Sequence, residues 1–459
     1  MNIFYQRTFF ALIILALLNP LYGDSSERAK GLKYFRLNDY ENAVDCFQTH
    51  LGKNPGDKEI EKKYSLSCAQ LASQYAEKNL LSAAIEYGKK ALKFANNSTG
   101  LRKNLALYYN NYALSLSSTN ARQANDYLRE ALKYDRDNVS IKNNLSFSLA
   151  KEAKNDYEQD NLEPALKKLL ESLVYNPQNI NSCFYLGEIY YKKDDLNQAI
   201  KYWENVLKIN PGQAGIEERI KKAKNENQVE TKFNFEKFVN FKVKFEGYEN
   251  VSSAWRILII LEEARSKLGA DFRFYPKAVL TVIVYSDQQF KAVTGGEEWM
   301  SGVYDGKIRV RIGESTHDEE NLRKLLYHEY THALIYEIAK NNIPVWLNEG
   351  LAQFAEPQKN NIIAEEKALR EKLRKEKLFS LADLDKVFLE KKDADQIRIA
   401  YLEAKSFVYR FANVYGSYSF YGLLDNLGKG KNIEAVFKEV FFKNLADLEK
   451  EWRAYLAQE

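Results

Sequence analysis

Two histidines and a glutamate lie close together in Leu325–Tyr336, which reads Leu-Leu-Tyr-His-Glu-Tyr-Thr-His-Ala-Leu-Ile-Tyr. His328 and His332 are four residues apart, so in a helix they lie on one face, one turn apart, and both imidazoles can face one ion. Glu329 points roughly a quarter turn away, toward the water that such an ion would activate. The chain has four histidines, so a chance match is on the order of a few in a thousand. The pattern predicts a zinc-binding helix with Glu329 as its base.

A third zinc ligand must come from elsewhere, because a hydrolytic zinc takes three protein ligands and keeps one position for water. Glu349 follows seventeen residues after His332, within Pro344–Glu356. The Asn-Asn-Ile-Pro stretch between them predicts the end of one helix and the start of a second, which can bring Glu349 back to the metal. No histidine follows His332, which excludes a three-histidine site. The alternative is a structural pair of histidines buried in a helix.

The two motifs together resemble the gluzincin metallopeptidases, in particular the peptidase MA-like domains related to aminopeptidase N. In that family a Trp-Leu-Asn-Glu-Gly segment, here Trp346–Gly350, supplies the third zinc ligand shortly after His-Glu-x-x-His. The resemblance covers roughly residues 233–459. It implies one Zn²⁺ per chain held by His328, His332 and Glu349, with Glu329 as the base.

Two further features of the family bear on the site. Relatives also carry a glutamate two turns past the third ligand, here Glu356, which either steadies a zinc histidine or is a solvated helix charge. Aminopeptidases use a Gly-x-Met-x-Asn strand to hold a free N-terminus, and neither Met1 nor Met300 belongs to such a strand. We therefore expect cleavage within a chain, by an endopeptidase.

Peptide hydrolysis builds negative charge on the carbonyl oxygen, and zinc usually shares this charge with a hydrogen-bond donor. Ala400–Val408 resembles the start of the family's tyrosine-containing helix, which implies Tyr401 as the donor. The alternative for Tyr401 is packing in the core. Tyr409, Tyr304 and Arg398 are the other candidates for the donor.

The elements expected to position these residues form an α+β domain with a small sheet. The final strand, Lys307–Ile312, follows a tight turn at Asp305-Gly306. Its apolar residues alternate with Lys307, Arg309 and Arg311, which predicts an exposed edge strand beside the metal-binding helix, to which substrate could add. The other expected elements are a half-buried strand at 239–245, a helix at 254–268 and a central strand at 279–284.

The preceding part of the chain, residues 25–226, repeats itself. Gly31, Tyr34, Ala43, Phe47 and Pro55 recur with identical spacing as Gly187, Tyr190, Ala199, Trp203 and Pro211. Three looser units lie between them, marked by Ala84/Ala91, Ala124/Ala131 and Ala165/Pro177. About five units thus resemble the tetratricopeptide repeat, a helical hairpin that stacks into a solenoid. Its concave face either binds protein partners or serves only as a structural arm. The charged segment 215–230 is expected to be a solvent-facing cap and linker.

The first residues resemble a secretory signal peptide, residues 1–23. Arg7 precedes an apolar run at Phe9–Leu18, which Asn19-Pro20 ends and Gly23 follows. Ten apolar residues are too few to span a bilayer, which needs about 20, so the mature chain is expected to have no membrane span. The alternative is an uncleaved anchor. In both cases we expect export to the periplasm, the cell surface or the medium.

Composition limits the remaining possibilities. A net charge of +4 from 67 basic and 63 acidic residues gives no concentrated basic face for nucleic acid, and three cysteines argue against a disulfide framework. We predict a mostly α protein, with a tetratricopeptide-like α-solenoid at 25–226 and a zincin-like α+β domain at 233–459. The expected function is a zinc endopeptidase whose repeat array recruits protein substrates or partners. The alternative is a repeat scaffold of an envelope assembly with a vestigial metallopeptidase domain.

Overall fold

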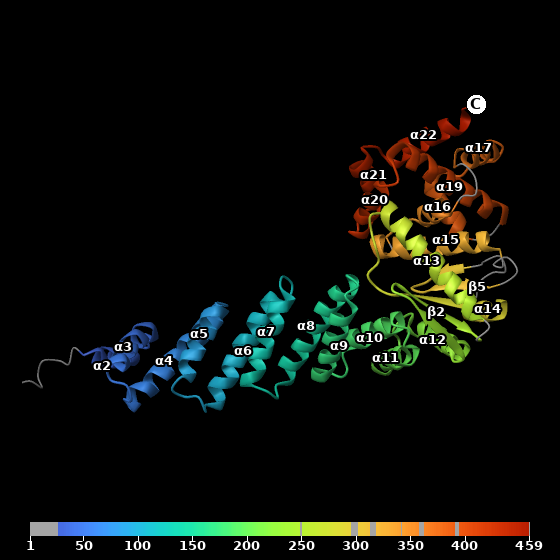
Figure 1. Ribbon diagram of the computed structural model, residues 1–459. Coiled ribbons are helices and arrows are strands. Elements are labelled where there is room, and N and C mark those ends of the chain that lie inside the picture. Colours follow the sequence, from blue (N-terminus) through green and yellow to red (C-terminus); the bar gives the residue numbers. More distant parts are fainter. Residues whose placement is uncertain are drawn as a thin grey trace, which may run out of the picture. The chain divides into compact units, whose positions relative to one another are not determined.

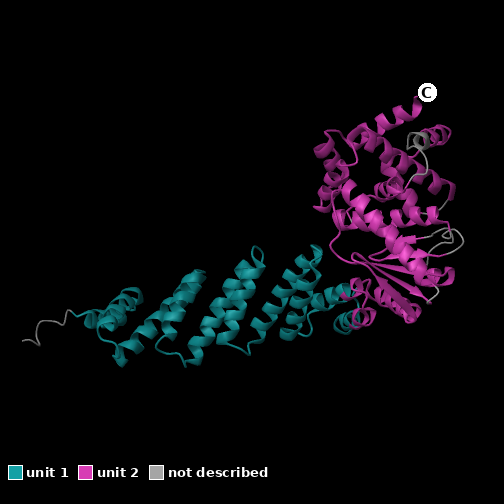
Figure 2. Ribbon diagram, viewed as in Figure 1, with its two compact units in different colours: residues 1–189, 202–213 teal, residues 190–201, 214–459 magenta. Residues whose placement is uncertain are grey.

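The computed structural model describes residues 26–247, 250–294, 302–312, 318–340, 342–357, 362–390 and 394–458. The expected signal segment, residues 1–23, lies outside the described residues. The chain forms two compact units (Figure 2). Unit 1 comprises the residues up to 189 together with 202–213, and unit 2 comprises 190–201 and 214–459. Helices dominate both units, and a small mixed sheet lies in unit 2 (Figure 1), which confirms the expected fold class.

The repeat region consists of helices that pack in consecutive hairpins. A Cβ atom at Gly31 would lie 2.6 Å from the Phe47 ring, and one at Gly187 would overlap the Trp203 indole, so the two helices of each hairpin approach closely only because these positions are small. The helices are α2 (Glu27–Arg36), α3 (Tyr40–Lys53), α4 (Lys58–Glu77), α5 (Leu81–Leu92), α6 (Thr99–Leu116), α7 (Ala121–Tyr134), α8 (Val139–Glu158), α9 (Leu162–Tyr175), α10 (Ile180–Lys192) and α11 (Leu196–Ile209).

The sheet of unit 2 has the strand order β1-β2-β3-β5-β4. β2 pairs parallel with β3, and β3 pairs parallel with β5. At the two edges of the sheet, β1 pairs antiparallel with β2, and β4 pairs antiparallel with β5. The strands are β1 (Phe233–Lys237), β2 (Phe241–Glu246), β3 (Leu280–Tyr285), β4 (Gly302–Tyr304) and β5 (Ile308–Arg311).

The two faces of the sheet are covered by different helices. Because side chains alternate along a strand, Phe241, Val243 and Phe245 of β2 join the core under α13 (Val251–Asp271) and α15 (Glu319–Ala339). Lys242 and Lys244 face the other side, which also carries α12 (Ile216–Glu230) and α14 (Asp287–Thr294). The sheet is therefore the middle layer of three.

The prediction of an exposed, charged edge strand at Lys307–Ile312 is wrong. β5 lies between β3 and β4, and Lys307 and Arg309 are 1% and 0% exposed. The strand at the edge beside α15 is the short β4. The alternation of charged and apolar residues arises because both faces of this strand are buried. One face is apolar, and the other carries charges that are paired with carboxylates of other elements.

These carboxylates come from the α10–α11 turn, from α12 and from the β4–β5 turn. Lys307 Nζ lies 2.9 Å from Asp194 Oδ1, and Arg309 Nη2 lies 2.8 Å from Glu226 Oε1. Arg309 Nε also donates to Asp305, at 3.0 Å. Burying such charges is tolerable only when each has a close partner. The group is therefore a mutually dependent set of ion pairs.

Segment 215–230 is accordingly not the solvent-facing cap and linker that its composition predicts. Glu226 and Glu230 are buried, and Glu230 pairs with Lys244. Burial acts to raise the pKa of Asp194, but Lys307 and Lys244 outweigh it and hold that pKa below its ordinary range. The α10–α11 turn and α12 are therefore structural parts of unit 2.

The remainder of unit 2 is helical and packs against α15 and its neighbours. Its helices are α16 (Val345–Ala355), α17 (Ile362–Leu373), α18 (Leu381–Glu390), α19 (Ala394–Tyr415), α20 (Ser419–Gly428), α21 (Ile433–Phe441) and α22 (Leu445–Ala457).

Replacing Glu226 by glutamine tests the buried ion pairs. The substitution removes a negative charge that Arg309 and Lys307 need, so the free energy of unfolding should fall by about 3–5 kcal/mol. Urea denaturation followed by circular dichroism measures this. As a control, Glu439→Gln breaks an exposed pair with Lys431 and should change stability by less than about 1 kcal/mol. Equal effects of the two substitutions would show that the buried ion pairs do not depend on Glu226.

Candidate metal centre

Helix α15 carries His328, Glu329 and His332. The Asp318 side chain caps its start by accepting a hydrogen bond from Glu320 N at 3.2 Å. One face of the helix is apolar and fully buried against α13 and the sheet, which fixes the helix's rotation and turns the histidines toward α16. The residues of that face with no exposed area are Leu326, Tyr330, Ala333 and Leu334.

Helix α16 carries Glu349. Its first turn is held by Trp346 N, which donates to Asp385 Oδ1 at 3.0 Å. A Cβ atom at Gly350 would lie 2.7 Å from the Ala404 carbonyl oxygen, so the glycine lets α16 pack closely on α19. With Gly350 facing α19, the adjacent Glu349 is on the side of α16 that faces α15.

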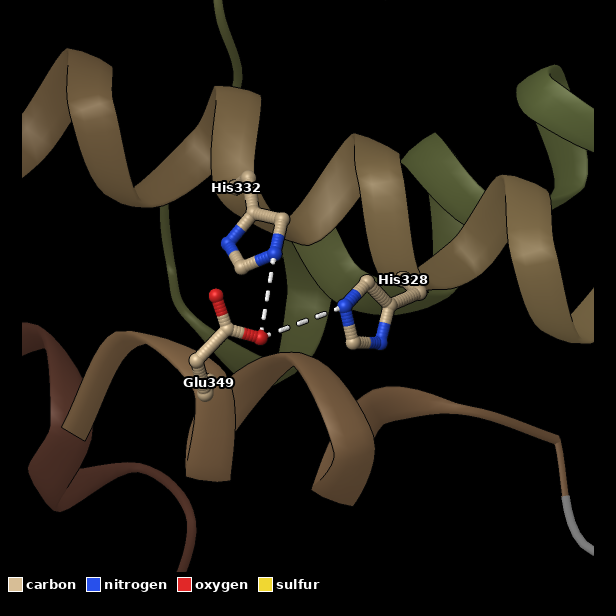
Figure 3. Close-up of side chains that lie close together, drawn as sticks. All are labelled: His328, His332 and Glu349. Atoms are coloured by element: carbon tan, nitrogen blue, oxygen red, sulfur yellow. Dashed lines mark ion pairs between the residues drawn. The ribbon is translucent and has the colours of Figure 1, made fainter. Parts of the chain in front are cut away.

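The structure brings the three predicted ligands together. Glu349 Oε2 lies 3.5 Å from His328 Nε2 and 3.7 Å from His332 Nε2 (Figure 3). Over the described part of the chain, these residues form the group whose donor atoms, all within 4.8 Å of one another, could hold a metal ion. Two imidazole nitrogens and a carboxylate oxygen fit a divalent cation such as zinc.

The outer nitrogen of each imidazole has its own partner. His328 Nδ1 lies 2.9 Å from Glu356 Oε1, and His332 Nδ1 lies 3.1 Å from Asn348 Oδ1. Carboxylate and amide oxygens only accept hydrogen bonds, so each Nδ1 donates and each Nε2 is left to face Glu349. For Glu356 this favours a role in holding a histidine of the cluster over that of a solvated helix charge. Asn348 is not among the predicted site residues, although it directly precedes Glu349 in the same motif.

Glu329 lies against the edge strand of the sheet. It is 4% exposed, and a Cβ atom at Gly302 of β4 would come within 2.6 Å of Glu329 Oε1. Its Oε2 accepts no hydrogen bond from the described residues. Burial raises the pKa of Glu329 to about 8, and the Glu349 carboxylate adds to the rise. A glycine at position 302 is thus what allows a carboxylate to sit between α15 and β4.

Tyr401 lines the same cavity, which has a volume of about 700 Å³. Burial raises the pKa of Tyr401 above its ordinary range, with contributions from the carboxylates of Glu349 and Glu329. Of the other candidate donors, Tyr304 also lines the cavity, whereas Tyr409 packs on Phe354 and Arg398 pairs with Glu376. The cavity is lined by residues 302–304, 324, 325, 328, 329, 332, 335, 336, 340, 343, 345, 348, 349, 353, 356, 388, 389 and 401.

Family models match a segment in each of the two parts of the chain. Residues 262–458 match the family model of the Peptidase MA superfamily, and residues 180–213 match that of the tetratricopeptide repeat. A comparison with curated proteins found no match.

Solved structures similar to this chain include a tetratricopeptide-repeat protein. It is a thermophilic protein of Thermus thermophilus, with 17% identity over 42% of this chain and 94% of that one, at a TM-score of 0.17. Another is MamA, with 19% identity over 40% of this chain and 96% of the other, at 0.20. A third is PilW, a type IV pilus biogenesis factor, with 18% identity over 55% and 96%, at 0.20. With TM-scores this low, the likeness says nothing of this chain's partners.

In the described part of the chain, no helix has both the length and the apolar character needed to cross a bilayer.

Replacing Glu356 by glutamine tests the contact at His328. Loss of the carboxylate weakens the hold on the imidazole, so metal affinity should fall about 10- to 100-fold while the fold stays intact. Competition with a chromogenic chelator measures the affinity. Glu319→Gln, at an exposed position of the same helix, is the matched control and should leave the affinity unchanged. If both variants bind metal as the parent does, Glu356 has no part in the site.

Glu403, two residues after Tyr401, gives a prediction about pH. Its side chain is fully buried and accepts a hydrogen bond from Phe379 N at 2.8 Å, and burial raises its pKa to about 7. The folded state therefore favours the protonated form, and the stability that Glu403 contributes below about pH 4.5 is lost as the pH rises through 7. Glu403→Gln mimics the protonated form. The free energy of unfolding of this variant should exceed the parent's by about 3 kcal/mol at pH 8 and should be close to the parent's at pH 4.5. Urea titrations at the two pH values measure both differences. A difference that does not grow with pH would contradict the shifted pKa.

Proposed function

We propose that this chain, in which tetratricopeptide repeats precede a peptidase MA-like domain, is a zinc-dependent endopeptidase. One observation carries the proposal. Glu349 and the Nε2 atoms of His328 and His332 converge in a cavity that also holds the buried carboxylate of Glu329. A structural pair of histidines would need neither this third donor nor an oriented partner at each Nδ1.

The donor set favours zinc over other common divalent cations. Calcium and magnesium prefer six or more oxygen ligands, including water, whereas two imidazoles and one carboxylate are typical of hydrolytic zinc sites. We propose one Zn²⁺ per chain, held by His328, His332 and Glu349.

Bound zinc would polarise the substrate carbonyl and lower the pKa of a water molecule. Glu329 accepts the proton of the attacking water and later passes it to the leaving amine. The oxygen Oε2, which has no partner among the described residues, is available for this proton. The Tyr401 hydroxyl donates a hydrogen bond to the carbonyl oxygen as negative charge develops there.

Substrate would lie along the edge strand β4 rather than along β5. β4 pairs with β5 on one side, and an extended peptide can add to its other side through main-chain hydrogen bonds. The residues that line the cavity include Lys324 and Leu325, which precede His328 on α15, and Ile343 and Val345, which follow the end of that helix. Room on both sides of the scissile bond supports cleavage within a chain.

The repeat array would recruit protein substrates or partners, and residues 1–23 would direct export. Neither role depends on the chemistry at the zinc. The alternative, a repeat scaffold of an envelope assembly with a vestigial peptidase domain, predicts no proteolysis and partner binding that is insensitive to changes in the cavity.

Glu329→Gln tests the mechanism. The amide keeps the size of the side chain and all three ligands, so the protein should still bind one zinc per chain. It cannot take the water's proton, so the rate of peptide hydrolysis should fall by about 10²–10⁴. Zinc content by atomic spectroscopy and turnover of a peptide library measure the two effects. Hydrolysis at the parental rate in this variant would exclude the proposed role of Glu329.

Two companion variants separate binding from catalysis. Glu349→Gln removes a charged ligand and should lose zinc and activity together. Tyr401→Phe should keep zinc and lower kcat with little change in KM, because its hydrogen bond forms mainly in the transition state. A Tyr401→Phe enzyme with unchanged kcat would place Tyr401 among the packing residues.

A further inference from the structure

One end of the cavity is lined by residues that have no role in the proposed hydrolysis. Beyond His332, the wall consists of Ile335 and Tyr336 on the last turns of α15, Tyr304 at the end of β4, and Ile343 and Val345 where α16 begins. The rings of Tyr304 and Tyr336 meet edge to face, with centroids 5.8 Å apart. Tyr304, Ile343 and Val345 are only partly buried and pack on the main core of unit 2, so apolar surface is open to the cavity.

The charged side chain that lines this end of the cavity, among the described residues, is a lysine. Lys340 lines the cavity and lies 3.7 Å from Glu337, and Lys192 Nζ lies 5.8 Å above the Tyr336 ring. The carboxylates that line the cavity, Glu329, Glu349 and Glu356, all belong to the metal cluster and its contacts. The far end is therefore unfavourable for a cationic side chain and would desolvate a carboxylate.

The direction of the bound substrate follows from Glu329. β4 runs along α15 from Gly302, beside Glu329, to Tyr304, beside Tyr336. Glu329 passes its proton to the leaving amine, so the amine side of the scissile bond lies toward Gly302. The acyl side then lies toward Tyr304 and Tyr336, which corresponds to a substrate strand antiparallel to β4.

We propose that this end of the cavity is a subsite that selects a large apolar side chain, aromatic or branched aliphatic, on the acyl side of the scissile bond. The subsite comprises Tyr304, Ile335, Tyr336, Ile343 and Val345. The proposal rests on the proposed function, since it takes the direction of the substrate from the role of Glu329. Burying an aromatic side chain against these residues removes apolar surface from water, and a small side chain leaves the space unfilled.

Two small compounds test the subsite without turnover. N-acetyl-phenylalanine hydroxamate and N-acetyl-alanine hydroxamate bind metal through the same group, and each places its one side chain on the acyl side. Calorimetry on the zinc-loaded full chain should show the phenylalanine compound binding at least about tenfold more tightly. Equal affinities, or no binding of either compound to protein that holds zinc, would overturn the subsite.

Variants locate the preference within the cavity. Tyr336→Ala should reduce the affinity ratio of the two compounds to about threefold or less. Ile343→Ala, at a partly buried position at the edge of the core, should reduce it as well and gives an answer if Tyr336→Ala fails to fold. Ile259→Ala, at an exposed position of α13 away from the lining of the cavity, is the control and should leave the ratio unchanged. If the affinity ratio of the two compounds is unchanged in both subsite variants, the selectivity does not come from these residues.

Digestion of a peptide library by the parent protein separates this proposal from the proposed function. Cleavage after large apolar residues supports both. Cleavage with no preference on the acyl side overturns the subsite and leaves the endopeptidase intact. A hydroxamate preference without any hydrolysis excludes the peptidase and overturns the assignment to the acyl side, and leaves only an apolar binding pocket beside the metal cluster.

Discussion

The arrangement of the cavity in unit 2 depends on the close approach of the Glu349 carboxylate to the imidazoles of His328 and His332. Glu349 Oε2 lies within 3.7 Å of both Nε2 atoms, and the Nδ1 atoms are already engaged by Glu356 and Asn348. The repulsion between the Glu349 carboxylate and two unprotonated Nε2 atoms is relieved by a cation between them. In its absence it is relieved by protonation of His328, whose pKa burial lowers but Glu349 and Glu356 raise by more. The convergence of the three side chains requires helices α15 and α16 to meet at a fixed angle. The apolar face of α15 and the glycine that seats α16 on α19 are the elements that fix this angle.

The other side of the cavity depends on charges that lie far from the metal site. β4 approaches Glu329 through Gly302, and β4 pairs with β5. Arg309 of β5 and Lys307, which directly precedes β5, are buried among carboxylates. These carboxylates come from the α10–α11 turn and α12, just where the repeats end. The edge strand beside the candidate base is thus stabilised by residues that the sequence pattern assigns to the repeats and their linker. A peptidase domain cut at residue 233 would lose these partners.

Local patterns in the sequence predicted much of this arrangement. The spacing of His328 and His332, the helix break before Glu349 and the turn at Asp305-Gly306 are each encoded within a few residues, and the structure has the expected elements at all three places. The exposure of β5 was predicted wrongly because alternation cannot distinguish a solvated charge from one paired with Asp194, 113 residues away. Gly302 and Asn348 were missed for the same reason, since their contacts with Glu329 and His332 appear only once the chain is folded.

We propose that His328, His332 and Glu349 together hold one zinc ion. Zinc K-edge X-ray absorption on protein loaded with one equivalent of zinc tests this proposal, because the spectrum reports the ligand types. We predict two imidazole nitrogens with oxygen ligands and no sulfur, and the loss of the bound species in Glu349→Gln. A zinc bound through a single imidazole or through sulfur, or a spectrum unchanged in Glu349→Gln, would contradict the proposal.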